Sequence, residues 1–177
     1  MIYHSKEVEE SGILTIAQNM CVAARTAPKT RGIDFLDTCI ITGDEKELLA
    51  VKMENLADTL EMAFFVRDAD CIRKSQAVVL VGSRYTQRGL NEGCQYCNFT
   101  NCKDCADHNG VCVYDPIDLG IALSSAVSIA GAAYADSRIM FSVGKAALDL
   151  NFLDDSIKII MGIPISATGK SPYFDRN

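Results

Sequence analysis

The sequence predicts a layered α+β domain with a cysteine-rich insertion, and three observations support this fold class. First, segments with helical spacing of apolar residues and short apolar runs typical of strands are mixed without regular alternation. Second, the chain has 177 residues, the length of a single domain, and 49% of them are hydrophobic, which is enough for a buried core. Third, residues 83–115 are polar and hold five of the eight cysteines. We therefore expect one domain over residues 1–177, with residues 83–115 as an insertion within it.

The first half of the chain is expected to supply two helices and two strands. Residues 7–25 repeat apolar side chains every three or four positions, as an amphipathic helix does. Residues 37–42 contain Thr-Cys-Ile-Ile-Thr, which is typical of a strand. From residue 43 to about residue 66 the apolar residues again keep helical spacing, so one long helix is expected. Residues 77–81, Ala-Val-Val-Leu-Val, form a run typical of a buried strand.

Two helices and a strand are expected after the insertion. Residues 119–135 carry no charge, but a membrane span needs about 20 strongly apolar residues, and this run is diluted by Gly and Ser. We interpret it as a buried helix that begins at Pro116 and whose small residues permit close packing. A second helix is expected over residues 137–150 and a closing strand over residues 157–162. No membrane association is predicted.

Charge and cysteine content narrow the classes of function. The net charge of −6 disfavours nucleic-acid binding, which depends on Lys and Arg neutralising phosphates. The first ten residues carry acidic side chains where a secretory signal needs a basic start and an apolar run. We therefore expect a cytoplasmic protein in a reducing compartment, where clustered thiols are more often metal ligands or redox groups than disulfides.

The five clustered cysteines have the spacing C-x2-C-x4-C-x2-C-x6-C, formed by Cys94, Cys97, Cys102, Cys105 and Cys112. A C-x2-C turn brings two thiolates to one metal centre, and thiolates select zinc, Cu(I) or iron–sulfur clusters. Only four residues separate Cys97 from Cys102, whereas zinc ribbons separate their two C-x2-C pairs by about 12 or more. The spacing therefore favours a [4Fe–4S] cluster, with zinc as the alternative.

Five thiols exceed the four that a cluster needs, so the ligand set is open. Residues 94–102 resemble the C-G-x-C-G-x-x-x-C run of small four-iron modules in anaerobic electron-transfer proteins, which close with one later cysteine. Gln95 and Asn98 replace both glycines of that run. The resemblance leaves Cys105 spare and implies four ligands: Cys94, Cys97, Cys102 and Cys112. In the alternative, Cys105 ligates and either Cys94 or Cys112 is spare.

The flanking segments resemble the nitroreductase-like flavoproteins. Residues 23–32, AARTAPKTRG, are similar to an A-A-x-x-A-P motif that precedes a strand and a helix in those proteins. Residues 118–144 are similar to their central dimer helix and the turn after it, and residues 159–164 are similar to their closing strand. Nearly the whole chain is similar to a family of prokaryotic proteins described as containing a ferredoxin domain, on the motifs Asp118-Leu-Gly-Ile-Ala and Gly169-Lys-Ser-Pro-Tyr-Phe-Asp-Arg176. The resemblance implies a nitroreductase-like fold and a homodimer centred on the helix of residues 117–135.

The resemblance also implies FMN as a cofactor. Nitroreductases usually begin with an R-R-S-x-R run that grips the FMN phosphate, and no such run occurs in this sequence. Two groups of cations are candidates for an anion or cofactor site: Arg25, Lys29 and Arg31 in one segment, and Lys170 and Arg176 in the C-terminal motif. The alternatives are a solvated charged loop for the first group and an ordinary charged tail for the second.

Two hypotheses of function follow. The first is a cytosolic iron–sulfur protein that passes electrons to a redox partner protein or, as an oxidoreductase, carries out flavin-assisted reduction. The second is a non-enzymatic binding or structural protein whose insertion is stapled by zinc or by a cluster. The cysteine spacing favours the first hypothesis, and the missing phosphate-gripping run favours the second. The sequence identifies neither a catalytic residue nor a substrate.

Overall fold

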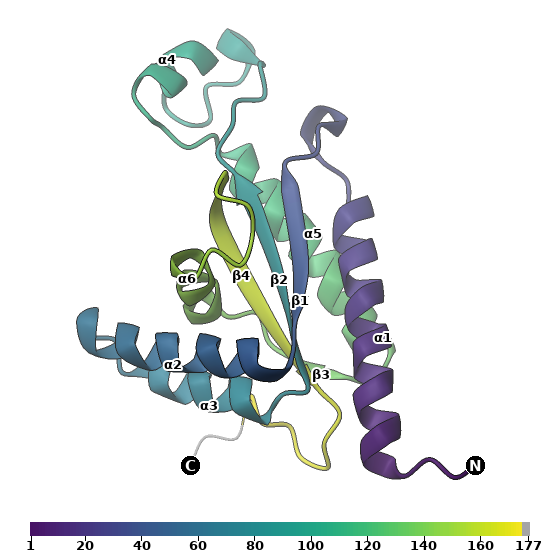
Figure 1. The fold of residues 1–177 in the computed structure, drawn as a ribbon. Coiled ribbons are helices and arrows are strands. Elements are labelled where there is room, and N and C mark those ends of the chain that lie inside the picture. Colours follow the sequence, from purple (N-terminus) through teal and green to yellow (C-terminus); the bar gives the residue numbers. More distant parts are fainter. Residues whose placement is uncertain (175–177) are drawn as a thin grey trace.

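A single antiparallel sheet of four strands organises the fold (Figure 1). The computed structural model describes residues 1–174. The strands, in the spatial order β1-β2-β4-β3, are β1 (Leu36–Ile41), β2 (Ala77–Arg84), β3 (Asp136–Ser137) and β4 (Ile157–Ser166). The inner strand β2 is buried from Ala77 to Ser83, as expected for an apolar run covered on both faces. The sheet is therefore the middle layer of three.

Helices α1 (Ser5–Thr26) and α5 (Tyr114–Ala132) cover one face of the sheet. α1 turns one side to the core, at the three- and four-residue spacing that the sequence predicted: Ile13, Ala17, Met20 and Ala24. α5 buries Leu119 and several alanines against the same cluster. Small side chains let these two helices pack closely, so the uncharged run of α5 belongs to the core.

Helices α2 (Gly43–Thr59), α3 (Phe64–Lys74) and α6 (Phe141–Asp149) cover the other face. A second cluster of buried apolar residues fills the space between them and the sheet. Successive strand residues point to opposite faces, so Leu80 belongs to this cluster while Val79 belongs to the cluster beneath α1 and α5.

The structure confirms the predicted α+β layering, with three changes in the elements. The helix expected from residue 43 to residue 66 is two helices, because Glu61 adopts a left-handed φ of 55° after the end of α2. β4 continues four residues beyond the predicted end at Gly162. The short strand β3 was not predicted. It ends at Ser137, the first residue of the helix expected over 137–150, and that helix begins only at Phe141.

The cysteine-rich insertion leaves the body between β2 and α5 and stands at one end of the sheet (Figure 1). Its irregular part is residues 85–113, which from here on is called the insertion. It contains two short helical segments, η2 (Asn91–Gly93) and α4 (Cys102–Asp107), and a third, η1 (Thr30–Gly32), lies in the body between α1 and β1. Within residues 1–174, no helix combines the length and apolarity that crossing a membrane requires.

Candidate metal centre

Four cysteines of the insertion line one small pocket, together with Leu90, Phe99 and Tyr114. They come from three parts of the chain, namely one C-x2-C turn, the start of α4 and the stretch before α5, and they are Cys94, Cys97, Cys102 and Cys112. The fold thus gathers the four cysteines that the resemblance to four-iron modules implied. That they bind a metal stays a prediction.

The turn that carries Cys94 and Cys97 has a glycine-like backbone although no glycine lies in it. Gln95 has a φ of 56° and Asn98 a φ of 64°, so both residues are in the left-handed region. These are the two positions at which the four-iron modules have glycine, which adopts such a φ without steric cost. At both positions the chain therefore has a backbone conformation that glycine would adopt without strain.

Backbone N–H groups point at two of the sulfurs that line the pocket. The N–H of Asn91 donates to Sγ of Cys102 at 3.3 Å. The N–H groups of Tyr114 and Arg88 donate to the Cys112 thiol. Burial raises the pKa of the Cys112 thiol, and these two N–H groups oppose that rise. Such donors stabilise the thiolate, which is the form that binds a metal.

Cys105 is buried, as Cys112 is, but it differs from the other four cysteines because it does not line the pocket. It lies beneath Gly110, where an added β-carbon would be 2.9 Å from Sγ of Cys105 and 2.4 Å from the Phe99 ring. Burial, together with three nearby thiols, raises the pKa of Cys105 to about 11. The nearby thiols favour a ligand set that includes Cys105, whereas the residues that line the pocket favour one that includes Cys94. We favour the pocket, because a bound group needs space as well as nearby thiols.

Across residues 1–174, no three His, Cys, Asp or Glu side chains stand in the arrangement that holds a single metal ion. The remaining cysteines lie in the body, and they are Cys21, Cys39 and Cys71. Burial raises the pKa of all three thiols, to about 12 for Cys39. They are therefore protonated at neutral pH and behave as small hydrophobic side chains.

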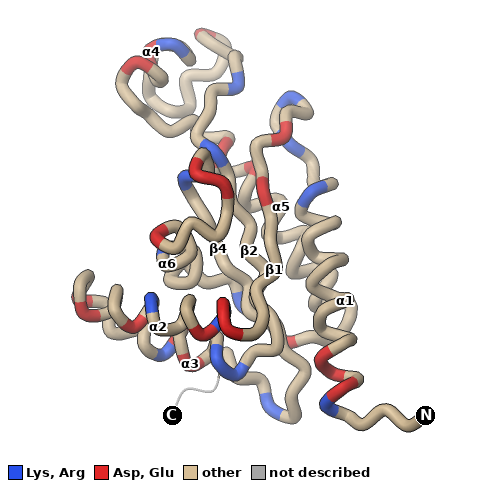
Figure 2. Tube along the Cα trace, viewed as in Figure 1, with Lys and Arg blue, Asp and Glu red and all other residues tan. Residues whose placement is uncertain are grey.

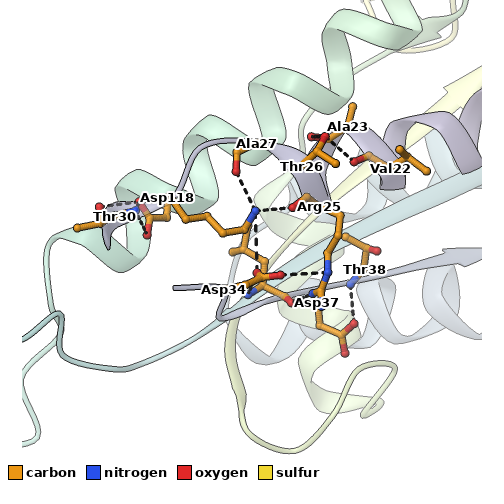
Figure 3. Close-up of polar contacts among 12 residues, drawn as sticks. Val22, Ala23, Arg25, Thr26, Ala27, Thr30, Asp34, Asp37, Thr38 and Asp118 are labelled. Carbon is orange, nitrogen blue, oxygen red and sulfur yellow. Dashed lines mark hydrogen bonds and ion pairs between the residues drawn. The ribbon is translucent and has the colours of Figure 1, made fainter. Parts of the chain in front are cut away.

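A buried group of charges anchors the insertion to the body. Arg88 is 2% exposed, and its Nη1 and Nη2 atoms lie 2.8 Å and 3.0 Å from the carboxylates of Asp115 and Asp118 in the first turns of α5. Thr86 donates its N–H and its hydroxyl to Asp115. Thr30 donates the same two groups to Asp118 (Figure 3). The network joins η1, the insertion and α5.

The predicted cations Arg25, Lys29 and Arg31 are all engaged within the chain. Arg25 forms an ion pair with Asp34 at 3.0 Å, and Lys29 donates to backbone carbonyls at the end of α1 (Figure 3). Arg31 donates to the carbonyl of Arg88 at 2.7 Å, so it braces the insertion. An anion-binding role for these three residues stays a prediction, and it would have to compete with these contacts.

Lys170 lies far from that group. It follows β4, at the end of the sheet where β2 begins, whereas Arg31 lies at the end where β2 leads into the insertion. One chain therefore does not bring the two predicted groups of cations together. Arg176 lies outside the described residues.

Comparison with solved structures identifies the fold as nitroreductase-like. The nitroreductase CinD from Lactococcus lactis in complex with chloramphenicol aligns with a TM-score of 0.62 at 12% identity, over 89% of this chain and 79% of that chain. A nitroreductase with bound FMN from Desulfitobacterium hafniense aligns with a TM-score of 0.58 at 11% identity, over 96% of this chain and 81% of that chain. At such identities the likeness concerns the fold alone.

Sequence comparison assigns the family. Residues 108–176 match the family described as "Uncharacterized protein containing a ferredoxin domain" (DUF2148). A protein of Archaeoglobus fulgidus, described as an uncharacterized protein, is 40% identical over 184 residues, which cover 99% of this chain and 98% of that protein. The chain belongs to this family of ferredoxin-domain-containing proteins.

Sequence analysis missed the charged group formed by Arg88, Asp115 and Asp118. One signal was present, because two carboxylates three residues apart begin a helix that is otherwise uncharged, and this spacing places both on one side. Buried carboxylates need a cation, but only the fold shows that Arg88 supplies it.

Proposed function

We propose that this protein is an iron–sulfur electron carrier built on a nitroreductase-like body. Cys94, Cys97, Cys102 and Cys112 would hold the cluster, which when bound supplies a redox couple. The observation that supports this proposal is the convergence of four thiols, from three parts of the insertion, on one pocket. The description of the family as containing a ferredoxin domain agrees with it.

The surroundings of the pocket suit a thiolate-bound cluster. N–H donors reach the sulfurs of Cys102 and Cys112, and hydrogen bonds to sulfur tune the potential of such clusters. Cys94, Cys97 and Cys102 are only half-buried. Electrons could therefore pass to a partner protein that docks on the insertion, along which residues of both charges occur (Figure 2).

We also propose that two copies of the chain associate through α5. Its outer side exposes Ile117 and Ile121, which are 43% and 37% accessible, and the small side chains of Ser124 and Ser128 continue that side. Apolar surface beside small residues lets a second helix approach closely. The proposal of an electron carrier does not depend on this association.

FMN is not needed for the proposed role. Three of the candidate cations are engaged in contacts within the chain, and Lys170 lies at the other end of the sheet. The two predicted groups of cations therefore do not form one FMN-phosphate site within a single chain. No step of the proposed electron transfer uses a flavin.

The proposal is tested with full-length protein purified without oxygen. We expect broad absorption near about 400 nm, stoichiometric iron and acid-labile sulfide, and bleaching on reduction with dithionite. Extraction with acid would release any flavin for separate measurement. Protein that contains only zinc, even after reconstitution with iron and sulfide, would contradict the proposal.

The second candidate function is a structural metal site. The insertion carries only two short helical segments, and a segment of this kind within a domain needs something to organise it. Zinc held by the same four thiols would do this without redox chemistry. It would require these thiols to move closer together, because no three His, Cys, Asp or Glu side chains within residues 1–174 are arranged to hold a single metal ion. The metal analysis just described separates the two functions, because zinc is spectroscopically silent and has no accessible redox change.

A further inference from the structure

Arg88 lies between the cysteine pocket and the body of the protein. Arg88 is one of the residues that line the pocket, and its backbone N–H group donates to the Cys112 thiol. The same residue forms both ion pairs with the start of α5. Its carbonyl accepts from Arg31, and the Phe35 ring lies under the guanidinium with its centroid 4.8 Å away. One residue thus contacts a candidate ligand and the body at once.

The charge of this group is unbalanced. Arg88 contributes one positive charge, Asp115 and Asp118 contribute two carboxylates, and all three side chains are almost fully buried. Because the surroundings are shielded from water, these charges act on the pocket more strongly than surface charges would.

One donor of Arg88 remains for a group in the pocket. Nη1 and Nη2 are used by the carboxylates, but Nε has no hydrogen-bond partner among the described residues although it is buried. An unpaired buried donor is costly unless something accepts from it. Because Arg88 is one of the residues that line the pocket, a group bound there is a candidate acceptor for Nε.

We propose that the buried charges of Arg88, Asp115 and Asp118 set the reduction potential of the bound cluster. In this proposal Arg88 is also a positioning residue for Cys112. This inference rests on the proposed function. Reduction adds one electron to the cluster, so a nearby cation favours the reduced form and a nearby carboxylate disfavours it. The two kinds of residue therefore act on the potential in opposite directions.

The test measures the reduction potential of the cluster in single variants of the full chain, by anaerobic titration followed in the visible spectrum. We expect Arg88→Gln to lower the potential, and Asp115→Asn and Asp118→Asn each to raise it. Arg84→Gln, a change of an exposed arginine at the end of β2, is the matched control and should shift the potential much less.

The double variant Arg88→Gln/Asp118→Asn keeps the net charge of the group and should return the potential toward that of the wild type. A purely structural anchor would destabilise all variants without this reversal of sign, and intact clusters with unchanged potentials would overturn the proposal. Breaking a buried pair is costly, so Arg88→Gln could lose the cluster. The two Asn variants then decide, because an upward shift supports the proposal and no shift contradicts it. Wild-type protein without iron would instead contradict the proposed function itself.

Discussion

Gly144 of α6 lies directly against the carbonyl group of Ile160 in β4. A β-carbon added to Gly144 would be 1.7 Å from that carbonyl oxygen, far inside any permitted contact. The obstacle is backbone of a strand inside the sheet, so it cannot move aside as a flexible side chain could. The absence of a side chain at this position sets how closely α6 packs on the sheet.

Replacing this glycine should therefore destabilise the protein. We expect Gly144→Ala to lower the free energy of unfolding by about 2 kcal/mol or more, as overpacking in a core does. The control is Gly12→Ala in α1, where an added β-carbon meets no atom within 4 Å and the better helix propensity of Ala should be neutral or favourable. Urea unfolding followed by circular dichroism compares the two, and equal midpoints would refute the packing argument.

The ligand set is tested by changing each clustered cysteine to serine. Iron and sulfide should be lost or badly reduced in four variants, those at Cys94, Cys97, Cys102 and Cys112, because a serine oxygen is a harder ligand and is hard to ionise at neutral pH. Cys105→Ser should keep nearly all of its iron. Iron lost from Cys105→Ser but kept in Cys94→Ser or Cys112→Ser would identify the other ligand set. Iron kept in all five would mean that no specific four-cysteine set exists.

The left-handed backbone at Gln95 predicts an unusual response to substitution. Gln95→Gly should hold the cluster at least as well as the wild type, because glycine has no steric cost at a φ of 56°. Gln95→Val should hold it less well, since a β-branched residue is strained there by roughly 1–2 kcal/mol. The rate of iron release to a chelator measures both. A valine variant that releases iron as slowly as the glycine variant would argue against this turn geometry.

Association through α5 predicts that a charge on its outer side yields monomers. Ile121→Glu should dissociate the dimer at micromolar concentration, because a carboxylate would be buried at the interface without a partner. Leu48→Glu, which changes an exposed apolar residue of α2 on the opposite face, should leave the mass unchanged. Light scattering reports the mass directly, and a wild-type monomer would end the proposal.

Tyr173 predicts a pH dependence of stability. Its hydroxyl bonds with the hydroxyl of Ser75 at 2.9 Å, and burial raises the pKa of Tyr173 to about 12 from a usual value of 10. A raised pKa in the folded state means that the neutral form is favoured, so its contribution to stability is complete below about pH 10 and lost as the pH rises toward 12. Tyr173→Phe should cost about 1 kcal/mol at pH 8, and this difference should narrow between pH 10 and 12. A constant difference over that range, in urea unfolding, would contradict the assignment.

Much of the layered arrangement could be predicted, because the spacing of apolar residues shows which side of a helix or strand is buried. The buried side of α1 and the uniformly apolar β2 follow from residue spacing alone. The break between α2 and α3 could not be predicted, since apolar spacing continues through it and Glu61 takes the left-handed conformation that usually marks a glycine or asparagine.

The candidate metal centre was predictable in composition but not in its surroundings. Cysteine spacing indicated five candidate ligands, and the resemblance to four-iron modules singled out the four that share the pocket. The partners of Arg25, Arg31 and Arg88 come from segments distant in sequence or from backbone carbonyls, which no local pattern encodes.

The hydrogen bonds between Thr86 and Asp115 hold together the two points at which the chain leaves the body after β2 and returns to it at α5. A segment whose ends are already joined adds little loop-closure entropy, and that cost rises only slowly with length. Such a segment can be shortened, lengthened or exchanged while the sheet and its five covering helices keep their packing. The ancestry of the cysteine segment and that of the body are therefore separate questions, and each can be traced through relatives that possess only one of the two.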